Sequence, residues 1–410
     1  MSGENGGNTK KKWTLARLAR GGWRRVDKVL RRLFRPFWRF FPVNPRKVVC
    51  FSYNGMFHAD NPALVADEML AVRPDLDVVW LVGDGGPRGR VGSCRTVPKG
   101  SWRALRELAT AGVWISNMRM HHQIAKKKGQ FYVQTWHGNL PLKAIEWDVA
   151  DTLSPEYLAD METDNRYCDL MLSGNDFFTH LCRRAFRFDG EVLECGTPRM
   201  DSLFRRDTAK AKTLRAHYGL EPEDAVVLYA PTFRQDIGHQ VYMTGFSALS
   251  AAFSRATGKR TKVLLRLHPN VQGFFKGRDW GENVVEAMDI PDIQDLYGIA
   301  DCLVTDYSSS MFEFALLEKP VFLLMEDFEA YGRERKLYFR PEELPFPVAY
   351  STSELVAAVE RADGETALWR EKAKAFFGRI GLHETGNATR LAAERILKEI
   401  PPPGNAGGGT

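Results

Sequence analysis

The sequence predicts an α/β protein with two Rossmann-like domains that face each other across a cleft. Short apolar strands alternate with helices from about residue 46 onward, which is typical of parallel-sheet architecture. The 410 residues, 44% of them apolar, suffice for two domains with sizeable cores. Segments rich in His, Arg, Ser, Thr and Gly follow several strands, where open α/β sheets bind their ligands.

We divide the chain into five parts. Residues 1–45 contain a disordered start and a basic amphipathic arm. Residues 46–205 form the first Rossmann-like domain and residues 206–380 the second. Residues 381–400 form a C-terminal helix, and residues 401–410, rich in Gly and Pro, form a disordered tail.

The first domain is expected to begin with an apolar strand directly after the arm. Further along, Ser154-Pro155 is a typical helix start, an N-cap followed by a proline at the first helical position. The predicted elements are strand 47–53, helix 62–72, strand 76–83, helix 102–111, strands 113–116 and 131–135, helix 155–164, strand 170–173, helix 176–186 and strand 192–195.

The second domain repeats the alternation of apolar strands and helices. Pro320 ends the helix that follows the strand at residues 302–305. The predicted strands are 225–229, 262–267, 283–287, 302–305 and 321–324. The predicted helices are 207–218, 246–257, 293–299 and 309–318, followed by 353–361, 368–378 and 388–400. Asp292 and Asp295 are expected to cap the helix at 293–299.

The positive charge of the chain is confined to the arm. Fourteen Lys and Arg and a single acid, Asp27, lie between Lys10 and Lys47, which gives this stretch a charge of +13. The whole chain is +6, so the remainder is about −7. Because the body is acidic, we expect no nucleic-acid partner.

The arm predicts a peripheral association with an anionic membrane surface. Apolar and aromatic residues recur every three or four positions, with arginines between them, and Pro36 is expected to kink or end this helix. The residues expected at the membrane are Trp23, Arg24, Arg31, Arg32, Phe37 and Trp38. Alternatively, the helix packs on the body of the protein or on a second copy. The sequence has neither a signal peptide nor an apolar stretch of about 18 residues.

The six cysteines show no paired spacing, and several lie inside apolar strands. We expect buried free thiols in a reducing cytosol. No Cys/His cluster has the spacing of a zinc site, so we expect neither a structural metal nor an obligatory cofactor.

A serine-rich turn is the strongest ligand-binding signal in the sequence. Asp306-Tyr307-Ser308-Ser309-Ser310 lies where a predicted strand passes into a predicted helix. A helix start offers free N–H groups and a positive dipole end, and three hydroxyls add further donors, so this segment is typical of a phosphate site. An ordinary serine N-cap is the alternative.

Four segments together resemble a known family. They are Trp136-His137-Gly138-Asn139-Leu140-Pro141-Leu142-Lys143, Tyr229-Ala230-Pro231-Thr232-Phe233-Arg234, Arg266-Leu267-His268-Pro269, and Thr305-Asp306-Tyr307-Ser308-Ser309-Ser310-Met311-Phe312-Glu313-Phe314-Ala315. In this order they resemble the CDP-glycerol glycerophosphotransferase family, from about Val48 to the C-terminal helices. Gly196-Thr197-Pro198-Arg199-Met200-Asp201 and Asp60-Asn61-Pro62 are weaker matches. The chain has Asn139-Leu140 where the family usually has Thr-Pro.

The resemblance implies a GT-B-like fold and a phosphotransferase on the cytoplasmic face of the cell membrane. An acceptor hydroxyl would attack the β-phosphorus of CDP-glycerol, or of CDP-ribitol, and expel CMP. The acceptor would be a lipid-linked glycan or a polyol-phosphate polymer of teichoic acid or capsule type. The first domain would bind the acceptor and the second the donor nucleotide. The oligomeric state is left open.

The same resemblance assigns roles to residues of both domains. His137 and His268 would be catalytic, with His137 as the base; the alternative for His137 is a structural histidine. Donor phosphates and nucleotide would contact Arg266, His268, Thr232, Arg234, Asp306, Ser308, Ser309, Ser310 and Glu313. Within this set Asp306 would orient the loop and Glu313 would bind ribose. The acceptor side would consist of Gly138, Lys143 and Arg199. Ion pairs are the alternative for the three arginines, and a solvated loop residue for Lys143.

Two other functions fit parts of the sequence. A sugar transferase of the same fold would take a UDP- or GDP-sugar and release a nucleoside diphosphate. A non-catalytic protein would use the arm to bind membrane or nucleic acid. Histidines and serines at the strand ends favour the phosphotransferase over both.

Overall fold

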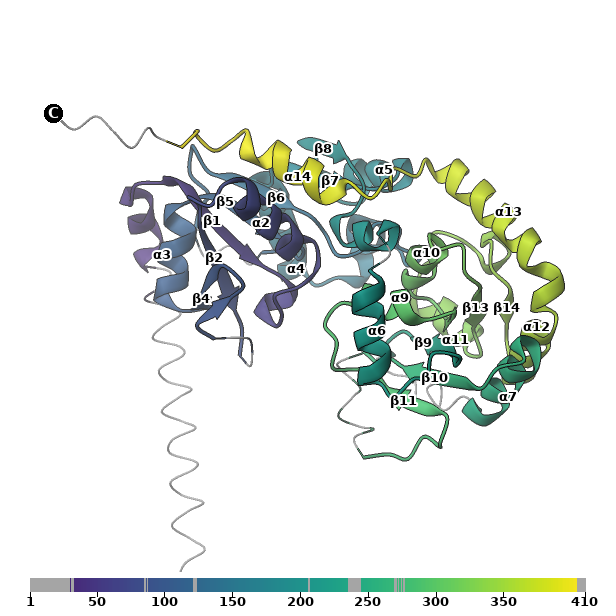
Figure 1. Cartoon of the computed structure of the whole chain (residues 1–410). Helices are drawn as coiled ribbons and strands as arrows, with labels where there is room; N and C mark the ends of the chain where they lie inside the picture. Colours follow the sequence, from purple (N-terminus) through teal and green to yellow (C-terminus); the bar gives the residue numbers. More distant parts are fainter. Residues whose placement is uncertain are drawn as a thin grey trace, which may run out of the picture.

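The computed structural model describes residue 30 and residues 33–84, 86, 88–120, 124–205, 207–234, 245–268, 271, 273, 275 and 277–403. It consists of two α/β lobes (Figure 1). Each lobe is built on a mainly parallel sheet with helices on both faces, which confirms the predicted fold class.

The first sheet has the strand order β3-β4-β2-β1-β5-β6-β7-β8, parallel except for the β3–β4 pair. Its strands are β1 (Asn44–Phe51), β2 (Asp77–Val82), β3 (Arg90–Val91), β4 (Cys94–Pro98), β5 (Ala111–Ser116), β6 (Phe131–Gln134), β7 (Leu170–Ser173) and β8 (Glu191–Glu194). Our prediction missed β3 and β4, because a two-residue strand has no periodicity and β4 alternates too briefly.

The helices of the first domain follow the predicted positions closely. They are α2 (Asp60–Val72), α3 (Trp102–Thr110), α4 (Pro155–Tyr167) and α5 (Asp176–Arg184), with 3-10 turns η2 (Tyr53–Gly55), η3 (Glu146–Thr152) and η4 (Pro198–Phe204). Ser154 caps α4 by accepting a hydrogen bond from the Tyr157 amide, as its sequence predicts. All six cysteines are buried free thiols.

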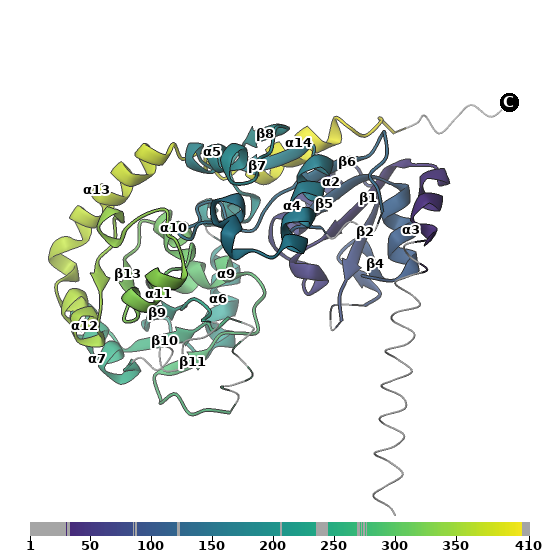
Figure 2. The same cartoon turned by 180° about the vertical axis from the view of Figure 1, so that it is seen from behind.

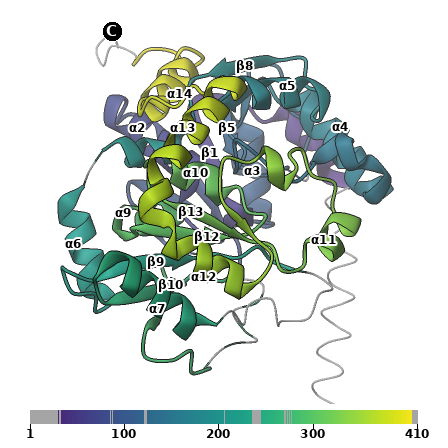
Figure 3. The same cartoon turned by 90° about the vertical axis from the view of Figure 1, so that its right-hand side faces the viewer.

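The second sheet is entirely parallel, with the order β11-β10-β9-β12-β13-β14. Its strands are β9 (Ala225–Tyr229), β10 (Thr261–Leu265), β11 (Val284–Glu286), β12 (Cys302–Thr305), β13 (Val321–Leu324) and β14 (Val348–Ala349). Its helices are α6 (Thr208–His217), α7 (Phe246–Thr257), α9 (Ile293–Ile299), α10 (Ser310–Ala315), α11 (Phe328–Glu334) and α12 (Thr352–Glu360), with a 3-10 turn η6 (Pro341–Glu343). Helices α7 and α12 lie side by side, as Figure 3 shows. This is the strand order of a Rossmann domain.

Two C-terminal helices connect the lobes. Helix α13 (Ala362–Ile380) runs along the second domain, and α14 (Ala388–Leu397) returns to the first domain and packs on α2 (Figure 2). Ala392 and Ile396 of α14 are fully buried in the same core as Val48 of β1. The predicted C-terminal helix therefore completes the core of the first domain.

Helix α10 is shorter than the predicted helix 309–318. After Ala315 the backbone forms i→i+3 hydrogen bonds, and Glu318 takes a left-handed conformation with φ of 55°. A left-handed residue ends a helix, here two residues ahead of Pro320. The predicted start and the buried face are retained.

Only the end of the arm lies in the described residues. A 3-10 turn, η1 (Arg35–Phe40), has Pro36 in its first turn and leads into β1. Trp23, Arg24, Arg31 and Arg32 lie outside the described residues. Phe37 is exposed, but Trp38, also predicted to face the membrane, packs against Trp102 of α3 and the first-domain core, because indole burial there removes apolar surface from water. Within the described part of the chain no helix has both the length and the apolarity to cross a bilayer.

Candidate active site

The site forms where the strand order of each sheet reverses. In the second sheet this is between β9 and β12, and in the first sheet it is between β1 and β5. Loops at such a point diverge and leave room for a ligand. The segments that the sequence singled out, around His137 and Asp306, follow β6 and β12 at these edges.

His137 is held in one tautomer. Its Nδ1 lies 2.7 Å from the Asn117 carbonyl oxygen, which only accepts hydrogen bonds, so Nδ1 is the protonated nitrogen of the neutral ring. Nε2 then has a free lone pair. Burial of the ring lowers the pKa of His137, with Arg199 acting in the same direction, against the hydrogen bond to Asn117 and the charge of Asp60. A neutral imidazole of this kind accepts protons near neutral pH.

The loop that presents His137 is sharply bent. Trp136 has a left-handed backbone, with φ of 53°, and its amide donates to Gln134 Oε1 at 3.0 Å. Its carbonyl accepts from Asn61 Nδ2, also at 3.0 Å. The Trp136 ring lies 4.5 Å from the imidazole of His137. The strained residue directly before His137 is thus fixed on both sides of its peptide.

A buried ion triad of Asp60, Arg199 and Glu313 joins the two domains near His137. Arg199 Nη1 lies 2.7 Å from Asp60 Oδ2, and Arg199 Nη2 pairs with Glu313 Oε1. Asp60, Arg199 and Glu313 are 3%, 8% and 8% exposed. Burial alone would raise the pKa of Asp60, but the Arg199 charge and the Tyr53 hydroxyl outweigh it and lower that pKa. Burial raises the pKa of Glu313 despite Arg199.

Polar side chains of the second domain complete the triad. Gln294 Nε2 donates to Glu313 Oε2 at 2.9 Å, and the Asp60 amide donates to Asp292 Oδ1 at 3.0 Å. Asp292 thus holds the first domain and makes no side-chain cap on α9, which corrects the predicted capping role. Burial next to Asp60 raises the pKa of Asp292 to about 6.

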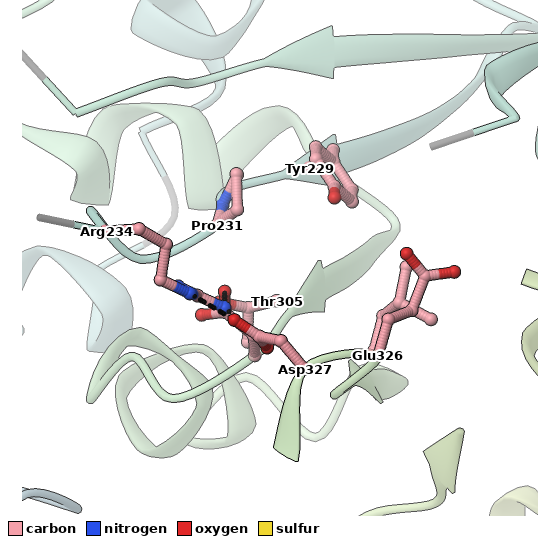
Figure 4. A pocket seen from close by; sticks show the side chains of 8 residues that line it. Tyr229, Pro231, Arg234, Thr305, Glu326 and Asp327 are labelled. Atoms are coloured by element: carbon pink, nitrogen blue, oxygen red, sulfur yellow. Dashed lines mark hydrogen bonds and ion pairs between the residues drawn. The ribbon is translucent and has the colours of Figure 1, made fainter. Parts of the chain in front are cut away.

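Asp306 shapes the loop ahead of the serine turn. Its carboxylate accepts from the amides of Thr232 at 2.8 Å and of Tyr307 at 2.6 Å, and pairs with Arg234 Nη2 at 2.8 Å. Arg234 also pairs with Asp327 at 2.7 Å, as Figure 4 shows. The cavity around them, about 10 Å³, holds about one water at most.

The serine turn meets the His137 loop across the cleft. A Cβ on Gly138 would lie 3.7 Å from Ser309 Oγ, an ordinary van der Waals distance, so the His137 loop reaches the Ser309 side chain. Ser308 and Ser309 are half-buried at this contact, whereas Ser310 is buried and donates to Ser308 Oγ at 2.8 Å. The residue directly after His137 therefore contacts a hydroxyl-rich helix start.

Comparison with known proteins agrees with this geometry. Residues 33–400 match the family model described as CDP-glycerol:poly(glycerophosphate) glycerophosphotransferase. The chain belongs to this family.

Relatives of known name share the match. The chain is 28% identical to a teichoic acid poly(glycerol phosphate) polymerase of Staphylococcus epidermidis, over 87% of this chain and 51% of that protein. It is 29% identical to a teichoic acid glycerol-phosphate transferase of Staphylococcus aureus, over 85% and 92%. A solved structure of the wall teichoic acid polymerase TagF, soaked with CDPG, superposes with a TM-score of 0.77 at 26% identity, over 97% and 98%. The chain thus spans about half the length of the first of these relatives.

The other family motifs also lie at strand ends of the second domain, near Lys143 of the first. Arg266 is half-buried and donates to the carbonyls of Ala287 at 3.1 Å and Pro291 at 3.3 Å. His268 is exposed and stacks on Phe233 at 5.4 Å. Burial lowers the pKa of His268, and the charges of Lys143 and Arg266 lower it further. A bound diphosphate would offset both charges and favour the protonated ring.

Lys143 lies on a segment of the first domain that pairs with the second. It forms an antiparallel bridge with Leu337, flanked by a 2.8 Å hydrogen bond from the Ala144 amide to the Lys336 carbonyl. Burial lowers the pKa of Lys143, and the Asp306 carboxylate opposes this. Lys143 is therefore not a solvated loop lysine, and it lies near the loop of Asp306.

Some predicted site residues are occupied by ion pairs. Arg234 and Arg199 each engage two carboxylates, and Glu313 engages Arg199 and Gln294. Their ligand-binding roles remain predictions. Asn117, which orients His137 through its backbone carbonyl, was not predicted. Nothing in the sequence around a loop asparagine indicates that its carbonyl contacts a histidine 20 residues away. Asp60 had a signal, the weak Asp60-Asn61-Pro62 match.

Proposed function

We propose that this protein transfers glycerol phosphate, or another polyol phosphate, from a CDP-polyol to an acceptor hydroxyl and releases CMP. The supporting observation is that His137, with Nε2 as its unprotonated nitrogen, lies in the loop whose Gly138 meets Ser309. Family membership and the names of the relatives point to CDP-glycerol as the donor and to a teichoic acid-type polymer as the acceptor. CDP-ribitol and a lipid-linked acceptor are the finer alternatives within this proposal.

In this mechanism His137 acts as general base. Its Nε2 takes the proton of the acceptor hydroxyl as the oxygen attacks the β-phosphorus. A new P–O bond forms to the acceptor, and the bond to the bridging oxygen breaks, so that CMP leaves with the electron pair. Ser308, Ser309, Arg266, His268 and Lys143 stabilise the charge on the phosphates. Because Arg266, His268 and Lys143 can carry positive charge at the phosphates, we propose transfer without an obligatory divalent metal.

Nucleotide release tests the reaction. The full-length protein is incubated with CDP-glycerol, CDP-ribitol, UDP-sugars or GDP-sugars, each with a lipid-linked acceptor extract. CMP from a CDP-polyol alone is expected. Release of a nucleoside diphosphate from a sugar nucleotide would instead assign a glycosyltransferase, and no release from any donor would favour a non-catalytic protein.

The pH dependence follows from the lowered pKa of His137. The base is active when unprotonated, so kcat/KM is expected to rise with pH through a pKa below 6.5 and to be flat above it. A pH profile of CMP release between about pH 5 and 9 measures this, because that interval spans the ordinary histidine pKa of about 6.5. An acidic limb centred above pH 7 would contradict the proposed base.

We also propose that the arm attaches the enzyme to the cytoplasmic face of the membrane. Leu33, Phe37 and Phe40 are 63%, 57% and 68% exposed, an apolar patch next to the basic segment. Such a combination binds anionic bilayers through charge and apolar burial together.

Vesicle binding tests the arm. Deleting residues 1–45 is expected to abolish sedimentation with phosphatidylglycerol vesicles and to leave CDP-glycerol binding intact. Each buried phenylalanine contributes about 1.5–3 kcal/mol, so Phe37→Ser with Phe40→Ser is expected to weaken binding by more than about tenfold. Leu368→Ser, which changes an exposed residue of the second domain, is the matched control. Undiminished binding of the deletion variant would refute the proposal.

A further inference from the structure

The segment between α13 and α14 lies on the loops behind His137. Its backbone bonds to the first domain at two points, from the Asp176 amide to the Gly381 carbonyl at 3.0 Å and from the His383 amide to the Gly174 carbonyl at 2.7 Å. Beyond it, the Ala388 amide donates to Asp201 Oδ1 at 2.9 Å. This crossover segment, residues 381–387, is therefore fixed to the first domain along its length.

Glu384 of the crossover segment reaches into these loops. One oxygen, Oε2, accepts from the Thr197 amide at 2.9 Å. The other, Oε1, accepts from the Thr197 hydroxyl at 2.6 Å and from Asn139 Nδ2 at 3.0 Å. Burial, with the charge of Asp201 adding to it, raises the pKa of Glu384 to about 7, against these three bonds. A carboxyl held by three donors has one orientation.

Asn139 transmits this restraint to the catalytic loop. It lies two residues after His137 and makes two more bonds: its Oδ1 accepts from the Gly174 amide at 2.8 Å, and its carbonyl accepts from Asn175 Nδ2 at 2.9 Å. A Cβ on Gly174 would overlap both Asn139 Nδ2 and Glu384 Oε1. Glycine at this position is therefore what permits the carboxyl and the amide to meet.

We propose that Glu384 is a positioning residue that holds Asn139 and thereby fixes His137 for catalysis. This inference rests on the proposed base role of His137. The Asn139 amide spans the gap between the Gly174 amide and the Glu384 carboxylate with one acceptor and one donor. The C-terminal crossover segment thus becomes part of the support of the active site.

A charge swap tests the pair. In Glu384→Gln, the side-chain oxygen still accepts from the Thr197 amide, but the new NH₂ group then faces the NH₂ group of Asn139. In Asn139→Asp, two carboxyl groups face each other. A displaced catalytic group can cost up to about a hundredfold, so each single variant is expected to lower kcat by about tenfold or more with little change in the KM for CDP-glycerol. The double variant restores one donor facing one acceptor, and most of kcat is expected to return.

A second measurement does not depend on transferase activity. In ¹⁵N-histidine-labelled protein, the His137 ring signals report whether Nδ1 remains protonated against Asn117. We expect a shifted tautomer balance in both single variants and the wild-type spectrum in the double variant. If the wild type releases no CMP, the proposed function fails while these spectra still test the positioning.

The matched control is Glu394→Gln, which removes an exposed carboxylate of α14 that pairs with Arg390 at 2.7 Å. It is expected to leave kcat and the His137 spectrum unchanged. The proposal is overturned if both single variants keep the wild-type kcat and spectrum. It is also overturned if the double variant folds but recovers neither kcat nor the His137 spectrum.

Discussion

Replacing His137 with alanine is expected to lower kcat for CMP release by about 10²–10⁴-fold, the usual contribution of a general base. Without the imidazole nothing at this position accepts the proton of the acceptor hydroxyl. The second domain contains the residues proposed to bind CDP-glycerol, Ser308, Ser309 and Arg266, and these remain in place in the variant. The dissociation constant of CDP-glycerol, measured by calorimetry, is therefore expected to change little.

Two comparisons make this result specific. His217→Ala removes an exposed histidine of α6 that pairs with Asp289 at 2.6 Å, and it is expected to retain activity. His137→Gln keeps a side-chain donor for the Asn117 carbonyl but lacks the basic nitrogen, so it is expected to be as inactive as the alanine variant. Activity of the glutamine variant near that of wild type would reduce His137 to a structural residue.

Replacing Arg199 with methionine is expected to destabilise the protein by about 3–5 kcal/mol, the cost of leaving buried partners of an ion pair uncompensated. Asp60 and Glu313 would then face each other's charge in a buried site. Because Glu313 belongs to the second domain, the contact between the domains is expected to loosen as well. Chemical denaturation followed by tryptophan fluorescence measures the loss.

A surface pair provides the matched control. Arg255→Met breaks an exposed ion pair with Glu360, 2.6 Å long, and such pairs contribute less than about 1 kcal/mol. Arg199→Lys keeps one charge but lacks the planar fork that meets both carboxylates, so an intermediate loss is expected. Equal stability of Arg199→Met and wild type would show that the triad adds nothing to the fold.

Much of the fold was predictable because its signals are local. An apolar run of four or five residues indicates a buried parallel strand wherever it occurs, and β7, β9, β12 and β13 have the predicted bounds. Capping residues and prolines predicted where helices begin, as Ser154 and Pro155 did for α4. The short strands β3 and β14 escaped prediction, since two residues have no periodicity and pair only because a neighbouring strand is present.

The site was predictable in its location and less so in its contacts. The rule that ligands bind beyond the carboxyl ends of strands predicted that the loops of His137 and Asp306 lie together, and Gly138 and Ser309 of these loops do meet. It did not indicate that Arg199 and Arg234 would be occupied by carboxylates. An arginine at a strand end has the same sequence context whether it meets a phosphate or an aspartate. Only the folded neighbourhood distinguishes the two.

The sequence by itself determined the α/β class, the two Rossmann-like domains, the family and the loops that form the cleft. These depend on hydrophobic periodicity and on motifs within short stretches of chain. Tertiary structure decided which groups meet: Arg199 with Asp60, 139 residues apart, and Asn139 with Glu384, 245 residues apart. Such pairs form because the folding of the first domain and the return of the segment before α14 bring distant backbone together, and no local pattern encodes that approach.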